Sequence, residues 1–277
     1  MLCLKTIIDS RSASFLDIKE ILRFKDLLWN LSKRDVLIRY KQTFIGVLWA
    51  VIRPLINILI FGLIAQFIER SASLSDKFIT VSAGVVLWTM ISTAINDISN
   101  SMVANSNILT KVYFPKIIIP LSSLTVCLID FFISFIILLV LRIFYLGLPG
   151  FEILLAPLFV IYAMLFSFSI GLFFAALNIK FRDVKFVIPV LVQIGFYVCP
   201  IFLSLEFYLD KLPENLEPIF LLNPLVNIIE GFKYSFLGEP MTVPIIYMYA
   251  SLGITFLFLF ISVRYFVKFE KTFADFV

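Results

Sequence analysis

Long apolar segments separated by short polar links dominate the pattern of residues along this chain. Each long segment has about 20 residues or more, the length that a helix needs to cross the hydrocarbon core of a bilayer. The segments that meet this length are residues 43–68, 78–98, 117–146, 152–179, 186–204 and 241–267. The pattern predicts an all-α integral membrane protein, with a six-span transmembrane domain over residues 43–277.

Residues 1–42, before the first span, are too polar to cross a membrane. Five apolar side chains share one face of a predicted helix over residues 15–41, namely Ile18, Ile21, Leu22, Leu28 and Trp29. A basic amphipathic helix with a Trp at its apolar edge is typical of the membrane surface. We therefore predict an interface helix within a cytoplasmic N-terminus. The alternative is a helix packed on a protein partner, and both can hold on different faces.

Residues 205–240 carry too many charges and prolines for an ordinary span, although the sequence FLLNPLVNII within them is apolar. Short helices that dip into the outer leaflet would reconcile these two properties. Re-entrant backbone of this kind is tolerated where protein or water covers it. We expect short re-entrant helices between the fifth and sixth spans.

Basic residues are distributed unevenly along this topology. With the N-terminus in the cytoplasm, 18 Lys and Arg residues lie inside and five lie outside. Cytoplasmic loops of membrane proteins are enriched in Lys and Arg, so this bias fixes the orientation and requires an even number of spans. Six spans with both termini in the cytoplasm satisfy it.

The composition of the chain mainly excludes classes of protein and kinds of site. Hydrophobic residues make up 61% of the chain and charged residues 15%, which is too apolar for a soluble enzyme. The chain has no His, no Walker sequence and no metal-ligand cluster, so we expect no catalytic residues and no metal or cofactor of its own. Cys3, Cys127 and Cys199 lie far apart and suit reduced thiols, and no cleavable signal peptide is apparent.

Two carboxylates fall within predicted spans. Asp97 lies near the cytoplasmic end of the second span and is expected to be solvated. Asp130 lies in the middle of the third span, where an ionisable side chain needs a partner. We expect Asp130 to pair with a basic or hydroxyl group of another helix.

Two short polar links face the cytoplasm in this topology. The link 98–111 is rich in Asn and Ser and can form an amphipathic helix, while the link 178–185 is tight and charged. Two such projections are what a peripheral cytoplasmic motor would contact, although either can be a plain connector. The candidate coupling residues are Ser99, Asn100, Asn105, Asn107, Lys180, Arg182 and Asp183.

Aromatic side chains recur in the first and fifth spans. Aromatic faces stack on sugar rings through modest contacts that still let the rings slide. The candidate pore-lining residues are Phe44, Trp49, Phe61, Phe196, Tyr197 and Phe202. Most of the 32 Phe residues must instead face lipid or pack against other helices, and this alternative applies to each candidate.

Five segments, taken in order, resemble the membrane subunits of bacterial polysaccharide ABC exporters, which move O-antigen, capsule or teichoic acid and belong to the ABC type-2 permeases. They are RDVLIRYKQTFIGVLWAVIRPL (34–55), KVYFPKIIIPLSSL (111–124), ALNIKFRDVKFVIPVLVQIGFYVCPIF (176–202), LLNPLVNIIEGFKYSFLG (221–238) and FEKTFADFV (269–277). The chain departs from the family at Arg53, where members often carry a neutral polar residue.

The resemblance implies a permease homodimer in the bacterial cytoplasmic (inner) membrane, bound to two copies of a separate ABC ATPase that uses ATP and Mg. It implies coupling helices at 98–111 and near 178–185, and external gate helices within 204–240. The substrate would be a polysaccharide on an undecaprenyl-type lipid carrier. Membrane lipid is the other expected partner, and nucleic acid is not.

With this substrate in view, a basic run at the level of the lipid head groups becomes a candidate head-group site. It comprises Arg34, Arg39, Tyr40 and Lys41. Arg makes bidentate contacts to phosphate oxygens, so the run could attract a pyrophosphate. Ordinary positive-inside anchoring explains the same residues.

Two other functions stay open. An ABC exporter permease of the same architecture could carry a drug, a lipid or haem. A membrane-embedded enzyme acting on lipid-linked substrates is the second possibility, although such enzymes usually use His or clustered carboxylates.

Overall fold

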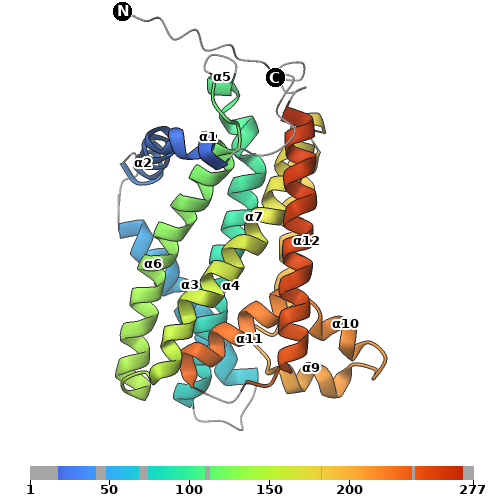
Figure 1. Cartoon of the computed structure of the whole chain (residues 1–277). Coiled ribbons are helices and arrows are strands. Elements are labelled where there is room, and N and C mark those ends of the chain that lie inside the picture. The colour runs from blue at the N-terminus through green and yellow to red at the C-terminus, as the bar shows by residue number, and fades with distance from the viewer. Residues whose placement is uncertain are drawn as a thin grey trace, which may run out of the picture.

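The computed structural model describes residues 18–41, 48–68, 74–109, 113–181, 183–238 and 241–270, and within these residues every regular element is a helix (Figure 1). The long helices are α3 (Trp49–Ile68), α4 (Leu74–Ala104), α6 (Ile118–Leu146), α7 (Ala156–Lys180), α8 (Val184–Val198) and α12 (Ile245–Glu270). The shorter ones are α1 (Ile18–Arg23), α2 (Lys25–Lys41), α5 (Ser106–Leu109), the 3-10 turn η2 (Phe151–Leu155), α9 (Leu205–Lys211), α10 (Glu217–Leu221) and α11 (Pro224–Leu237).

Four helices in the described residues are long and apolar enough to cross a membrane. They cover Asp76–Ala104, Ile118–Leu146, Phe151–Lys180 and Ile245–Glu270, and correspond to four of the predicted spans. The first and fifth predicted spans appear as shorter apolar helices, Trp49–Ile64 and Val184–Val198. The prediction of an all-helical protein with several apolar helices of spanning length is therefore confirmed for the described residues.

The fifth predicted span, 186–204, is helical over a shorter length than expected. Helix α8 ends at Val198, and Cys199 is extended with ψ 149°. Pro200 explains this end, because the ring of a proline disfavours helical backbone in the residue before it. Residues 201–204 then lead without helix into α9.

The bundle has two distinct ends (Figure 1). Helices α2 and α5 and the last turn of α12 lie at one end, which we call the α5 end. Helices α9, α10 and α11 lie at the other, which we call the α9 end. Helix α5 projects beyond the level at which α1 and α2 lie across the bundle.

Helix α4 runs through the centre of the bundle and packs against α3, α6, α7, α8 and α11. Glycines allow close approaches between these helices. A Cβ at Gly171 of α7 would lie 2.7 Å from the Ile98 side chain of α4, and a Cβ at Gly195 of α8 would lie 2.8 Å from Trp88. These helices could not keep their spacing with a larger residue at either glycine.

The polar link predicted at 98–111 is largely a continuation of the second span. Helix α4 runs on to Ala104, and the short helix α5 follows after a break at Asn105. Ile98 and Met102 are fully buried, so tertiary packing holds the helix where Asn and Ser alone would favour a connector.

Residues 205–240 form three helices, as the prediction of short helices requires, and α11 is the most buried of them. Asn223 caps its first turn through a hydrogen bond from the Leu225 amide, and Gly238 ends it with φ +77°. Arg142 of α6 donates to the carbonyl of Phe236 over 3.2 Å. This contact satisfies a carbonyl in the last turn of α11 and ties the helix to the bundle.

The predicted N-terminal interface helix is present in two pieces, with a break at Phe24. Helix α2 packs on α6 and buries Leu31 and Ser32. Two residues of the predicted apolar face, Leu22 and Trp29, are 63% and 65% exposed. The surface that packs on the bundle and the surface that carries Trp29 are thus different faces of one helix.

Candidate functional site

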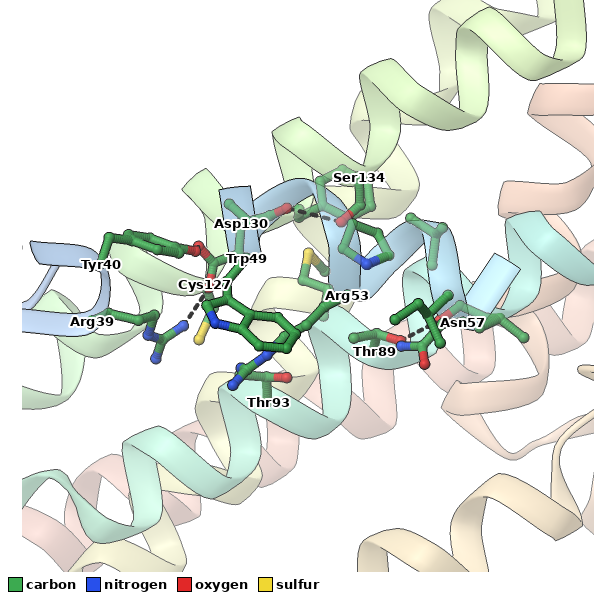
Figure 2. Close-up of a pocket in the computed structure, with 17 residues that line it drawn as sticks. Arg39, Tyr40, Trp49, Arg53, Asn57, Thr89, Thr93, Cys127, Asp130 and Ser134 are labelled. Atoms are coloured by element: carbon green, nitrogen blue, oxygen red, sulfur yellow. Dashed lines mark hydrogen bonds and ion pairs between the residues drawn. The ribbon is translucent and has the colours of Figure 1, made fainter. Parts of the chain in front are cut away.

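One guanidinium group joins three helices near the α5 end. Arg39 of α2 forms an ion pair with Asp130 of α6 (Figure 2) and a second ion pair with Asp97 of α4. Its Nη2 donates to Asp97 and its Nη1 to Asp130. The expected partner of Asp130 is therefore found, whereas Asp97 is paired and not simply solvated as we expected.

Tyr40 adds a second contact to the same carboxylate, because its hydroxyl donates to Asp130. Burial lowers the pKa of Arg39, but the charges of Asp97 and Asp130 outweigh it and the pKa lies above its usual value. Burial and the hydrogen bond to Asp130 raise the pKa of Tyr40. Arg39 therefore stays charged and Tyr40 neutral throughout the physiological pH range.

A cavity of about 350 Å³ extends from this cluster between α3, α4 and α6 (Figure 2). Its polar end holds Arg39, Tyr40, Asp130, Arg53 and Thr93, and the remaining wall is largely apolar. Such a cavity suits the polar head of an amphipathic ligand with the first part of its chain.

Arg53 is the cavity-lining cation that has no acidic partner among the described residues. Its guanidinium lies 5.8 Å from the centre of the Trp49 ring, and in Figure 2 it points towards Thr93. It enters at the second turn of α3, next to Pro54. A cation held on an aromatic face and lacking an acid is a natural contact for an anionic group.

The structure places only two of the four predicted head-group residues at the cavity, although Arg34 and Arg39 also line a common cleft between α2, α4 and α6. Arg39 and Tyr40 line the cavity and are engaged by Asp97 and Asp130. Arg34 and Lys41 line a separate groove on α2. Arg34 also pairs with Asp35 and donates to the Asn105 side chain over 2.6 Å, which ties α2 to the tip of α4.

Three of the predicted pore-lining aromatics form one cluster. The rings of Phe61 of α3, Phe196 of α8 and Phe202 lie 5.1–5.7 Å apart, and Trp88 of α4 lies 5.8 Å from Phe196. Tyr197 packs edge-on against Phe196 and is 66% exposed. Trp49 lies apart from this cluster, in the cavity, and Phe44 is outside the described residues.

The two predicted coupling segments meet through Asn178 at the end of α7. Its Nδ2 donates to the carbonyl of Ser99 over 3.1 Å and to Oδ1 of Asn100 over 3.0 Å. Ser99 is fully buried and its hydroxyl donates to the Ile95 carbonyl of its own helix, so its side chain does not face a partner. The two segments therefore form one unit at the α5 end.

The other candidate coupling residues are more accessible. Asn107 of α5, Lys180 and Asp183 are exposed, and Asn105 is half-buried beneath Arg34. Lys180 lies over the Phe181 ring at 5.0 Å. Arg182 is outside the described residues. Asn107, Lys180 and Asp183 thus remain candidates for direct contact with another protein.

Sequence reasoning left three residues out of its sites. Arg53 stood out as a departure from the family, and its position inside the predicted first span, 43–68, was a usable signal. Trp88 gave no such signal, because an isolated aromatic residue in an apolar span usually packs in the core. Asn178, a lone amide at the end of a span, could have been recognised as a candidate partner for another helix end.

Among the residues that the structure describes, no group of three or more His, Cys, Asp or Glu side chains could hold a metal ion. Cys127 is buried beside Asp97, with its Sγ 3.5 Å from the carboxylate.

Comparison with known proteins agrees with this architecture. The sequence profile of the ABC-2 type transporter family matches residues 26–237. The chain is similar to the O-antigen export system permease protein RfbA of Myxococcus xanthus, with 26% identity over 219 residues, or 79% of this chain and 83% of that protein. Two proteins of the same name from Klebsiella pneumoniae are 26% and 27% identical over 251 and 259 residues, each covering 90% of this chain and 94% of the relative. Because the profile covers well over half of the chain, the protein belongs to the ABC-2 type transporter family.

Proposed function

We propose that this chain is the transmembrane subunit of an ATP-driven exporter that moves a lipid-linked, O-antigen-like polysaccharide across the bacterial cytoplasmic membrane. The observation that carries the proposal is the similarity to O-antigen export permeases, which extends over 90% of the chain and 94% of two relatives. A likeness that spans nearly the whole of both proteins includes the coupling segments as well as the bundle.

In this proposal the six apolar helices all cross the membrane and the α5 end faces the cytoplasm. The basic residues of α1, α2 and the last turns of α12 lie at that end and support this orientation. The α9 end then faces outward, and α9, α10 and α11 act as external gate helices. Lys233, which donates to the Pro200 carbonyl from a buried position, would hold α11 against the end of α8.

Energy comes from a separate ABC ATPase, two copies of which bind a homodimer of this chain. Asn107, Lys180 and Asp183 are exposed at the α5 end and offer a contact surface. Asn178 fixes the inner ends of α4 and α7 to each other, so a displacement of one is passed to the other. ATP binding can drive the change because it favours one arrangement of the ATPase dimer over another.

One face of α8 suits contact with protein or water and not with lipid. It buries a single side chain, Ile188, and leaves the amide of Gln193 exposed in the middle of an apolar helix. An unpaired amide facing lipid would be costly. We place this face of α8, with the aromatic cluster around Phe196, at the conduit between two copies of the chain.

The carrier's pyrophosphate would enter the cavity beside Arg39 and contact Arg53. Arg39 and Tyr40 build the wall of this site and position α2, since both are already bonded to carboxylates. Arg53 has no carboxylate partner among the described residues and can make bidentate contacts to phosphate oxygens. The apolar wall beyond it suits the first isoprene units of the carrier.

Depletion of the chain in its native cell tests the function. We expect carrier-linked polysaccharide to accumulate on the cytoplasmic side of the inner membrane while surface polysaccharide disappears. Normal surface polysaccharide after depletion, with loss of another exported compound, would instead support a permease for a drug, a lipid or haem.

A further inference from the structure

A shallow groove runs along α2, and every described residue that lines it belongs to this helix. It has a volume of about 320 Å³ and is lined by Asn30, Lys33, Arg34, Leu37, Ile38 and Lys41. Three of these side chains are cationic and none is acidic. The groove is separate from the cavity that holds Arg39 and Arg53.

The charge of this groove is not compensated locally. Lys33 and Lys41 are exposed and have no acidic partner among the described residues. Arg34 is the exception, because it pairs with Asp35 at 2.6 Å. The whole segment 18–41 carries seven basic and three acidic side chains, so the surrounding surface reinforces the positive potential.

Apolar side chains project from the same side of the helix. Leu37 and Ile38 are 47% and 58% exposed, and Trp29, one turn before Lys33, is 65% exposed. Large apolar groups beside cations are costly in water but favourable at a bilayer surface, where the apolar groups enter the acyl region and the cations meet phosphates. Trp in particular prefers the level of the head groups.

The position of α2 in the bundle agrees with a location at the level of the lipid head groups. The helix lies across the bundle near one end of α6, while α5 projects further out (Figure 1). A partner that docks on the end of the bundle would reach α5 first. The exposed side of α2 is therefore better placed for lipid than for a peripheral protein.

We propose that this groove binds an anionic phospholipid through Lys33 and Lys41, as a site distinct from that of the polysaccharide carrier. The two lysines hold the head-group phosphate, and Leu37 and Ile38 contact the glycerol and upper acyl region. The bound lipid fixes α2 at the membrane surface. The assignment of the site to the cytoplasmic leaflet rests on the proposed function, whereas binding itself does not.

Brominated lipids test the proposal on the full chain. A Trp49→Phe, Trp88→Phe background leaves Trp29 as the single Trp, and the protein is reconstituted in equal parts of phosphatidylglycerol and phosphatidylcholine. Bromine on either lipid then reports which one lies beside Trp29. We expect phosphatidylglycerol to be favoured by about fivefold or more, since a lysine held beside an anionic head group contributes about a fivefold preference for anionic lipid. Added salt should reduce the preference.

A Lys33→Gln, Lys41→Gln variant should lose most of the preference, whereas Lys25→Gln, on the same helix but outside the groove, should keep it. Native mass spectrometry of the chain with its three Trp residues intact, in the presence of either lipid, provides a second measurement in case the Trp substitutions disturb folding. Arg53→Gln should leave the preference unchanged, because it removes the carrier contact alone.

Equal quenching by both lipids, or equal losses in Lys25→Gln and in the double variant, would overturn the proposal. So would displacement of phosphatidylglycerol by a polyprenyl pyrophosphate, which would identify the groove as a carrier site. Unchanged lipid preference with weaker binding of a co-expressed ATPase in the double variant would identify it as a protein contact.

Discussion

Asn178, at the end of α7, donates a hydrogen bond over 3.0 Å to the Asn100 side chain in the last turns of α4. The same amide donates to the carbonyl of Ser99. Two segments that the sequence places 78 positions apart are thus fastened to each other at the α5 end of the bundle, where we propose that the ATPase binds. A force applied to either segment is shared by both.

Asn178→Ala should weaken this attachment. The change leaves the buried Ser99 carbonyl and the Asn100 amide oxygen with one partner fewer, so we expect a loss of about 1–3 kcal/mol of stability. It should also lower the amount of polysaccharide exported per ATP hydrolysed. Thermal unfolding in detergent and paired transport and ATPase assays measure the two effects. Asn215→Ala, in the exposed turn between α9 and α10, is the control and should change neither.

Arg39→Gln should destabilise the packing of α2 on the bundle by about 2 kcal/mol, a value between those of exposed and buried ion pairs. The variant leaves Asp97 and Asp130 facing each other without a cation. The triple variant Arg39→Gln, Asp97→Asn, Asp130→Asn should recover much of the loss, because it removes the uncompensated charges. Melting temperatures in detergent give the comparison, and a triple variant less stable than Arg39→Gln would contradict the ion-pair account.

Arg53→Gln should reduce export of carrier-linked polysaccharide by about tenfold or more, the effect of losing a charge-assisted contact to phosphate. Insertion and melting temperature should remain normal, and Arg53→Lys should retain part of the activity. Arg264→Gln serves as the matched control. It removes an exposed arginine from the part of α12 that lies towards the α5 end. Export unaffected by Arg53→Gln would place the head group elsewhere.

Phe196→Leu tests the aromatic cluster as part of a sugar conduit. Leucine keeps most of the apolar volume, so stability should change little, whereas loss of the aromatic face should slow transport about fivefold. Phe196→Tyr should transport normally. Phe144→Leu, at a position that is 82% exposed, should have no effect on rate. Equal rates for Phe196→Leu and Phe196→Tyr would show that the cluster serves packing alone.

The membrane helices could be predicted because each is a continuous apolar segment, a local property of the sequence. The end of α8 was also encoded locally, in Pro200. Hydropathy averaged over a whole span does not show the effect of this single residue. The sequence allowed a helix after Ile98, but that this helix continues α4 without a break could not be predicted from its Asn and Ser residues. Asn96 and Asn100 bond carbonyls of their own helix, and the burial of Met102 against other helices decides the outcome.

The candidate sites depend on contacts between distant positions. Arg39 lies 58 and 91 positions from its two carboxylates. A sequence shows that Asp130 needs a partner, but not which cation the fold supplies. For the same reason, the run of basic residues before the first span looked like one site. The helical turn of α2 directs Arg39 and Tyr40 to the cavity and Lys41 to the groove, while Arg34 lies both at the groove and at a cleft that it shares with Arg39.

Transport in reconstituted vesicles tests the central claim most directly. The chain and its ATPase are placed in vesicles that contain a carrier-linked polysaccharide, and the polymer that crosses the bilayer is measured by its exposure to a glycosidase on the far side. The account predicts transport that needs ATP, this chain and the ATPase together, and that falls with Arg53→Gln. Polymer that stays on its original side in the presence of all three would contradict it.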